Sequence, residues 1–164
     1  MILGLTLETF TILHVIISLV AIVSGLIVLL GMLSAERLPG LTALFLATTV
    51  LTTATGFMFP ATRFTPAIGV GFVSAAVLAA ALLALYAFDL SSSWRWIYVV
   101  AAVFALYLNV FVLVVQAFQK VPTLHALAPN GNELAFIVAQ TVVLALFAWL
   151  GTLAVRRFHP EFAA

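Results

Sequence analysis

The sequence predicts an all-α protein that crosses a membrane five times as one compact helical bundle. Of its 164 residues, 66% are hydrophobic and only 7% are charged, whereas a soluble domain carries roughly 25% charged residues. The charged side chains are also confined to the joints between five long apolar stretches. We therefore expect a single transmembrane domain over residues 1–164, with the lipid bilayer as its surroundings.

Five stretches have the length and composition of membrane-spanning helices. They are 10–33, 41–59, 67–88, 96–118 and 134–155. None of them contains Asp, Glu, Lys or Arg. Each is long enough to cross a hydrocarbon layer of ~30 Å at about 1.5 Å per helical residue.

Local signals justify the boundaries in turn. The stretch 10–33 is too long for the apolar part of a secretory signal, and no basic residue precedes it, so we expect it to stay in the mature chain. Helix breakers or caps separate the stretches that follow. These are Leu38-Pro39-Gly40, Phe59-Pro60, Thr65-Pro66, Ser91-Ser92-Ser93 and Asn130-Gly131.

The joint 119–133 is longer than a turn requires and contains two prolines. Within it, residues 120–129 have the pattern of a short helix with Pro122 in its first turn. Two roles stay open for this joint. It is either a lid over one end of the bundle that presents His125 to a ligand, or a helix lying flat on the lipid surface.

Basic residues predict the orientation, because cytoplasmic loops are enriched in Lys and Arg. Arg63 and Lys120 lie on one side of the five spans, and four basic residues lie on the other. Those four are Arg37, Arg95, Arg156 and Arg157. The bias predicts an N-terminus outside and a C-terminus in the cytoplasm, in a cell membrane that we expect to be a bacterial inner membrane. Trp94, Trp96 and Tyr98 fit an aromatic belt at the inner boundary.

Small residues predict where the helices approach one another closely. In the first stretch, one face is shared by His14, Ser18, Ala21 and Gly25. The third stretch carries two rows with a small residue at every fourth position. They are Gly71, Ala75 and Ala79, and beside them Ala76, Ala80 and Ala84. We expect the third helix to pack through these rows.

Uncharged polar side chains within the spans gather toward the predicted outer end. Each must find a hydrogen-bond partner where the bilayer offers no water. Asn109 lies seven residues before Gln116 and eleven before Lys120, so the three share one helical face. Glu133 and Gln140 repeat the seven-residue interval. The first span also holds His14, the only histidine within a span.

These residues predict a funnel-shaped pocket that opens at the outer end. The candidate ligand-binding residues are His14, Arg63, Asn109, Gln116, Lys120, His125, Glu133 and Gln140. The alternative for each polar residue within a span is a hydrogen bond that only joins two helices, worth ~0.6 kcal/mol on average in one measured system. Such bonds need not gather at one end, whereas a site open to water on one side must.

Several function classes find no support in the sequence. The chain has no cysteine, which excludes disulfides and thiol catalysis. Its net charge of +1 gives no basis for nucleic-acid binding. It contains no HExxH, GxSxG, P-loop or dinucleotide-binding motif, and its carboxylates are divided between the two membrane faces. We therefore expect neither an enzyme nor a metal site.

Two functions fit this inventory. In the first, the pocket binds a small amphipathic molecule, quinone-like or lipid-like, and the protein is a carrier or sensor. In the second, the protein is a structural or assembly subunit of a larger membrane complex, redox complexes included, and a partner helix meets the same polar residues. Association of several copies of the chain also stays open.

Haem b bound through His14 is a weaker alternative. A haem held by two histidines needs a second imidazole at a similar depth on a facing helix. No other predicted span contains one. A haem shared between two copies of the chain, or a loop that folds His125 inward, would be required.

One part of the chain resembles known proteins. The stretch from Tyr107 to Gln116, YLNVFVLVVQ, is followed by Lys120-Val121-Pro122 and Leu127-Ala128-Pro129. It resembles a group of short, uncharacterised bacterial membrane proteins, which implies an integral membrane protein and no particular activity. The tryptophan-rich sensory proteins are similar in length and helix count, but this chain has only three tryptophans and lacks their Trp-Asn-Pro-Pro motif.

Overall fold

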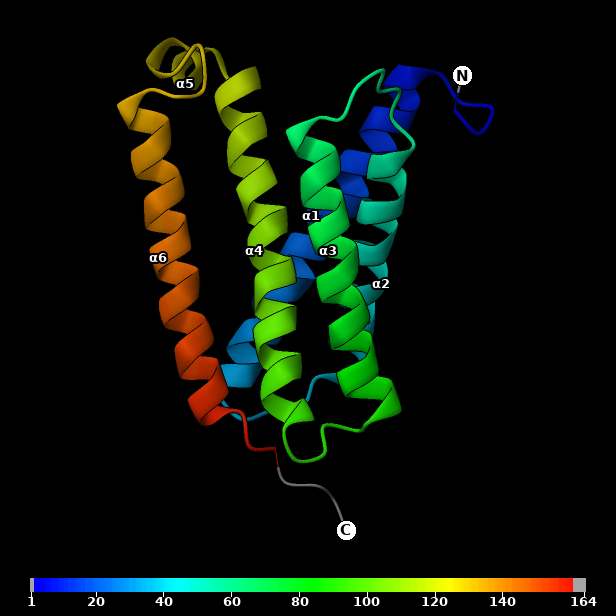
Figure 1. Cartoon of the computed structure of the whole chain (residues 1–164), viewed down its shortest axis with the longest axis vertical. Coiled ribbons are helices and arrows are strands. Elements are labelled where there is room, and N and C mark those ends of the chain that lie inside the picture. The colour runs from blue at the N-terminus through cyan, green and yellow to red at the C-terminus, as the bar shows by residue number, and fades with distance from the viewer. Residues whose placement is uncertain (1, 161–164) are drawn as a thin grey trace.

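A computed structural model describes residues 2–160 of the chain and shows a bundle of long helices (Figure 1). The structure is 79% helix, and the described residues form no β-strand. Five helices are long and apolar enough to cross a membrane, by length and composition. This confirms the prediction of an all-α chain with five such helices.

The helices follow the predicted spans closely. They are α1 (Leu7–Leu33), α2 (Pro39–Phe57), α3 (Pro66–Leu82), α4 (Trp94–Lys120), the short α5 (Pro122–Leu127) and α6 (Leu134–Arg157). A π-helical turn, η1 (Leu83–Ala87), continues α3. The predicted third span therefore changes its hydrogen-bonding pattern before it ends, and α5 confirms the short helix with Pro122 in its first turn.

Caps and prolines explain where the helices begin. The side chain of Thr6 accepts a hydrogen bond from the amide of Thr9, so α1 starts before the apolar stretch does. The side chain of Thr65 does the same for the amide of Ile68 at the start of α3. Both α2 and α3 have proline in their first turn, where the missing amide hydrogen costs nothing.

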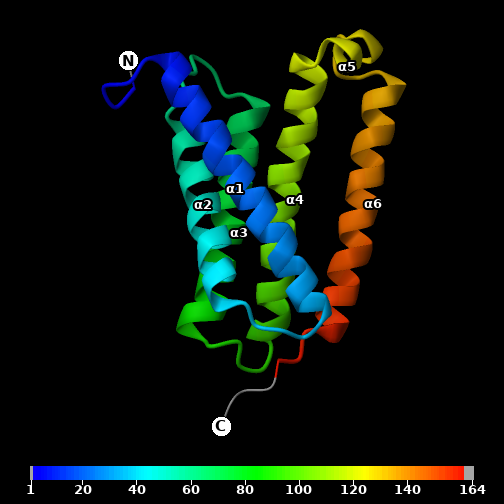
Figure 2. The same cartoon turned by 180° about the vertical axis from the view of Figure 1, so that it is seen from behind.

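The chain runs up and down, so its connections gather at two ends of the bundle. The N-terminal segment, the α2–α3 connection and α5 lie at one end, which we call the α5 end (Figure 1). The α1–α2 connection, the η1–α4 connection and the last described residues lie at the other, which we call the C-terminal end. Helix α1 crosses the bundle obliquely, beside α2 at the α5 end and toward α6 at the C-terminal end (Figure 2).

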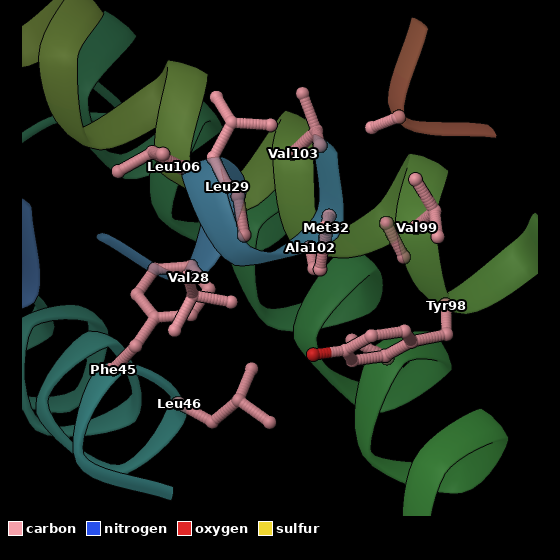
Figure 3. Close-up of a cluster of buried hydrophobic side chains, with 14 of the residues drawn as sticks. Val28, Leu29, Met32, Phe45, Leu46, Tyr98, Val99, Ala102, Val103 and Leu106 are labelled. Carbon is pink, nitrogen blue, oxygen red and sulfur yellow. The ribbon is translucent and has the colours of Figure 1, made fainter. Parts of the chain in front are cut away.

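The apolar core lies in the half of the bundle toward the C-terminal end. It joins Val28, Leu29 and Met32 of α1 to α2 and to the first half of α4 (Figure 3). Gly25 permits this close packing, because a Cβ atom there would lie 2.6 Å from Cδ1 of Leu106. Ala21 and Gly25 are both buried, which confirms the packing face predicted for the first helix.

Two further predictions hold only in part or are wrong. Of the small-residue rows on the third span, the first is wrong, since Ala75 and Ala79 are exposed, whereas the second is borne out at its end, where Ala84 is buried and Ala80 packs against the core. Tyr98 is only 2% exposed and belongs to the core rather than to an aromatic belt. Lipid is as apolar as the core, so residue size and hydrophobicity alone do not tell which side of a helix faces the other helices.

Candidate functional site

Helix α4 changes from mostly buried to mostly half-buried where its polar stripe begins. Most residues of α4 from Tyr98 to Leu108 are buried, whereas none from Asn109 to Ala117 is. Gln116 and Lys120, on the same face as Asn109, are exposed. Figure 2 shows the reason, since α1 lies over α2 at the α5 end and leaves α4 there less covered.

His14 is held in a defined orientation by α2. Its Nδ1 lies 2.7 Å from Oγ1 of Thr55, and the Thr55 hydroxyl donates to the carbonyl of Leu51 at 2.7 Å. Because the threonine proton is used in that bond, the Nδ1–H of His14 donates to Thr55. In the neutral ring, Nε2 is then the unprotonated nitrogen and can accept a hydrogen bond. The ring also packs edge-on against Phe59, with centroids 5.2 Å apart.

Two of the amides within the spans, Asn109 and Gln140, each join neighbouring helices. Nδ2 of Asn109 on α4 donates to Oγ1 of Thr49 on α2 over 3.3 Å. Nε2 of Gln140 on α6 donates to the backbone carbonyl of Phe111 on α4 over 3.1 Å. Asn109 and Gln140 therefore contribute to helix packing, which is the alternative that the sequence leaves open for each of them.

Two buried polar atoms in the same half of the bundle have no hydrogen-bond partner within residues 2–160. They are Oγ1 of Thr52 on α2 and Oε1 of Gln140 on α6. The neighbouring threonines, such as Thr49 and Thr55, donate their hydroxyls to carbonyls of the preceding turn. A buried polar atom without a partner is costly in an apolar medium, so both sites can accept a bond from something that the chain does not supply.

The carboxylate of Glu133 accepts hydrogen bonds from neighbouring residues of its own loop. Its Oε1 accepts hydrogen bonds from the backbone amide and the side-chain amide of Asn130, at 3.0 and 2.9 Å, and its Oε2 accepts one from the amide of Asn132 at 3.0 Å. Slight desolvation raises the pKa of Glu133, but these hydrogen bonds outweigh it and hold the pKa below its ordinary value. This carboxylate orders the connection before α6.

The remaining candidates lie at the rim of the α5 end. Arg63, in the α2–α3 connection, and His125, on α5, are both exposed. The structure thus places all eight predicted residues at or toward one end of the bundle. No hydrogen bond or ion pair joins two of these eight side chains, all of which lie in the described range.

A cavity that the sequence does not predict lies at the C-terminal end of the bundle. It measures about 370 Å³ and lies between α1, α2, η1, α4 and Phe158. Its walls are mostly apolar, but Thr42, Tyr98 and the ion pair between Arg37 and Asp89 also line it. The connections that shape it have left-handed backbone at non-glycine residues, a feature that residue types alone do not reveal. A second hollow, of about 320 Å³, lies between α4 and α6 and is lined mainly by apolar side chains.

The metal-ligating side chains of the described residues are dispersed. Within the described part of the chain, no three His, Asp or Glu side chains come together as they would around a metal ion. His125 is on α5 and His159 follows α6 at the other end, so neither lies on a long helix facing His14. Comparison with protein-family models, curated proteins and solved structures gives no match.

Proposed function

We propose that this protein binds a small amphipathic molecule at the α5 end of its bundle and serves as a carrier or sensor rather than as an enzyme. One observation carries the proposal: beyond Leu108, α4 is only partly buried, and its polar stripe there leads from the half-buried Asn109 to the exposed Gln116 and Lys120. The exposed amide of Gln116 in a membrane-spanning helix needs a polar partner that lipid tails do not provide.

The available hydrogen-bonding groups describe the ligand. Nε2 of His14, Oγ1 of Thr52 and Oε1 of Gln140 are acceptors or hydroxyls, while Gln116 adds amide donors. Such a site suits a molecule with an apolar body and one or two hydroxyl or carbonyl groups, as in a quinone, a quinol or a lipid.

The orientation belongs to the same proposal. We place the α5 end outside the cytoplasm and the C-terminal end inside, in a bacterial inner membrane, because Arg37, Arg95, Arg156 and Arg157 gather at the C-terminal end. The chain has no cysteine, so single cysteines report accessibility cleanly. Thr62→Cys should react with a membrane-impermeant maleimide in intact cells, and Ser92→Cys should react only after lysis. The reverse pattern would contradict the orientation.

The test of the function uses the full-length protein purified in a mild nonionic detergent. Small molecules that stay bound are extracted and identified by mass spectrometry, and an absorption spectrum is recorded. Gln140→Leu and Asn109→Leu should lower the amount of bound amphiphile several-fold with expression unchanged. Thr141→Val is the matched control, because the Thr141 hydroxyl bonds only to its own helix at Ile137.

The other functions are outcomes of the same experiment. Equal retention by Gln140→Leu, Asn109→Leu and Thr141→Val would refute the ligand site. A stoichiometric membrane subunit that co-purifies and is lost in Gln140→Leu would identify an assembly subunit, which the extensive exposure of α6 also favours. A Soret band lost in His14→Ala would identify haem.

A further inference from the structure

The cavity at the C-terminal end is independent of the α5-end site. It measures about 370 Å³, within the usual range for small-molecule sites. Val28 and Met32 of α1, together with Leu85 of η1, form apolar walls. Thr42 and Tyr98, both buried, add hydroxyl groups to the lining.

Acidic groups outnumber basic ones in the lining. Glu36 and Asp89 contribute two carboxylates against the single guanidinium of Arg37. That guanidinium is already engaged, because its Nη2 lies 3.4 Å from Oδ1 of Asp89. The lining side chains therefore carry a formal charge of −1, while the guanidinium of Arg95 lies behind Phe158, to whose carbonyl it donates.

Three aromatic rings complete the lining. Tyr98 and Phe158 lie with their ring centroids 6.1 Å apart, and Tyr86 is a largely exposed member of the same lining. A cation within about 6 Å of an aromatic face is attracted by the negative potential of the ring, and sites for quaternary ammonium groups are built in this way. Aromatic and acidic groups thus favour the same kind of ligand.

The backbone around this cavity is unusual. Tyr86 belongs to the π-helical turn η1, and π-helical turns occur frequently at functional sites. Asp89 and Leu90 follow with φ of 43° and 57°, left-handed values that non-glycine residues rarely adopt. Leu90 is nevertheless buried, at 2% exposure, so the packed core maintains this conformation. The strained turn holds Tyr86 and Asp89 at the rim.

From these observations we infer that the C-terminal cavity is a binding site for an amphipathic organic ammonium ion. The ammonium group lies at the rim between Glu36, Asp89 and the ring of Tyr86. The apolar part of the ligand extends toward Val28, Met32 and Leu85. The hydroxyls of Thr42 and Tyr98 accommodate a polar group at the junction.

Three probes with the same chain test this site: octyltrimethylammonium, octyl sulfate and octanol. Each is titrated into the full-length protein in nonionic detergent at low salt, below the probe's micelle concentration, and binding is followed by calorimetry. The trimethylammonium probe should bind in a 1:1 ratio, about fivefold or more tightly than the other two, as one close charge pair provides. Its affinity should fall as salt rises.

Variants locate the binding. Glu36→Gln and Asp89→Asn should each weaken binding of the ammonium probe, and Tyr86→Leu should weaken it about two- to fivefold. Glu8→Gln, at the α5 end, is the matched control and should leave it unchanged. The Glu36 residue is exposed and lies outside the strained turn, so Glu36→Gln tests the site even if Asp89→Asn disturbs that turn.

Opposite results would overturn the inference. Equal affinities for the three probes would indicate simple partitioning into the apolar surface. Tighter binding of octyl sulfate would indicate an anion site at Arg37. Unchanged binding in both Glu36→Gln and Asp89→Asn would exclude this cavity. Asn109→Leu should leave the ammonium affinity intact, which separates this result from the outcome at the α5 end.

Discussion

Gly25 determines how closely α1 approaches the core. It is buried, and a Cβ atom at this position would lie 2.6 Å from Cδ1 of Leu106 and 2.8 Å from the ring of Phe45. Those two side chains come from α4 and α2, so one glycine sits where three helices meet. In an apolar solvent, such close contact is the main source of helix association, since burial of apolar surface adds little.

Gly25→Ala should therefore destabilise the bundle. Neither Leu106 nor Phe45 can yield easily, because each is about 1% exposed and surrounded by the core. We expect the free energy of unfolding to fall by about 1–3 kcal/mol, the usual effect of overpacking. Unfolding by denaturing detergent, followed by circular dichroism, measures the change.

Gly40→Ala is the matched control for this prediction. It lies in the first turn of α2, and a Cβ atom there would have no neighbour within 4 Å. The substitution should leave stability unchanged or raise it slightly, since alanine favours a helix over glycine. If Gly25→Ala and Gly40→Ala changed the free energy of unfolding equally, the close approach at Gly25 would not contribute to stability.

The sequence predicts the close helix packing at Gly25 but not the burial of Tyr98. The face shared by Ala21 and Gly25 follows from helical spacing, and small residues have one obvious use there. Tyr98 lies beside Trp94 and Trp96 near a helix start, a pattern equally typical of an interfacial belt. Only the positions of α1 and α2 show that the Tyr98 ring is enclosed (Figure 3).

Among the elements, the α5–α6 connection is ordered by one carboxylate. Glu133 accepts hydrogen bonds from Asn130 and Asn132, and Gly131 between them adopts a left-handed φ of 74°. The sequence Asn-Gly-Asn-Glu predicts a turn, but it does not show that Glu133 bonds to its own loop instead of facing a ligand. That distinction depends on the backbone path, which the spacing of Glu133 and Gln140 does not specify.

The order of this connection should depend on pH. The pKa of Glu133 is lowered in the folded protein, so its contribution is complete above the unfolded value of about 4.3 and is lost as pH falls through the lower, folded value. Amide chemical shifts of Asn130 and Asn132, followed by NMR, should titrate with a midpoint below 4.3.

Glu133→Gln provides the comparison for that titration. It removes the charge but keeps the size of the side chain, so the two amide shifts should no longer titrate in this range. A midpoint above 4.3 in the unsubstituted protein would contradict the prediction.

For the molecule as a whole, the sequence predicts the helices but not their tilts within the bundle. Charge-free length defines each span, because no other arrangement satisfies the backbone of an apolar stretch in lipid. The tilt of α1, in contrast, follows from contacts such as Gly25 with Leu106. The gathering of polar residues toward the α5 end is predictable, because their positions along each helix follow from the sequence. The C-terminal cavity is not, because the left-handed backbone at Asp89 and Leu90 helps to shape it.

Because α1 is tilted, α6 has its buried residues only in the half toward the C-terminal end. These residues are Phe147 and Ala154. Nη1 of Arg95 on α4 also donates to the carbonyls of Val155 and Phe158, at 3.0 and 2.7 Å, where α6 ends. Toward the α5 end, the bond from Gln140 to Phe111 is the only side-chain hydrogen bond between α6 and α4 in the described range.

We therefore expect the bundle to vary more in width at the α5 end. Segments with few buried contacts open at lower free energy than the core. Pairs of spin labels on α1 and α6 measure this by electron paramagnetic resonance: Ile12→Cys with Ile137→Cys at the α5 end, and Ile27→Cys with Trp149→Cys nearer the C-terminal end. All four positions are exposed, and the chain has no cysteine of its own.

The distance distribution of the first pair should be broader than that of the second, and Gln140→Leu should broaden it further. A bound amphiphile between α1, α4 and α6 should narrow the first distribution and leave the second unchanged, since a ligand stabilises the arrangement that it binds. Equal widths for the two pairs would contradict a bundle held at one end. A second distribution that changed with the first would show instead that the whole of α6 moves as a rigid body.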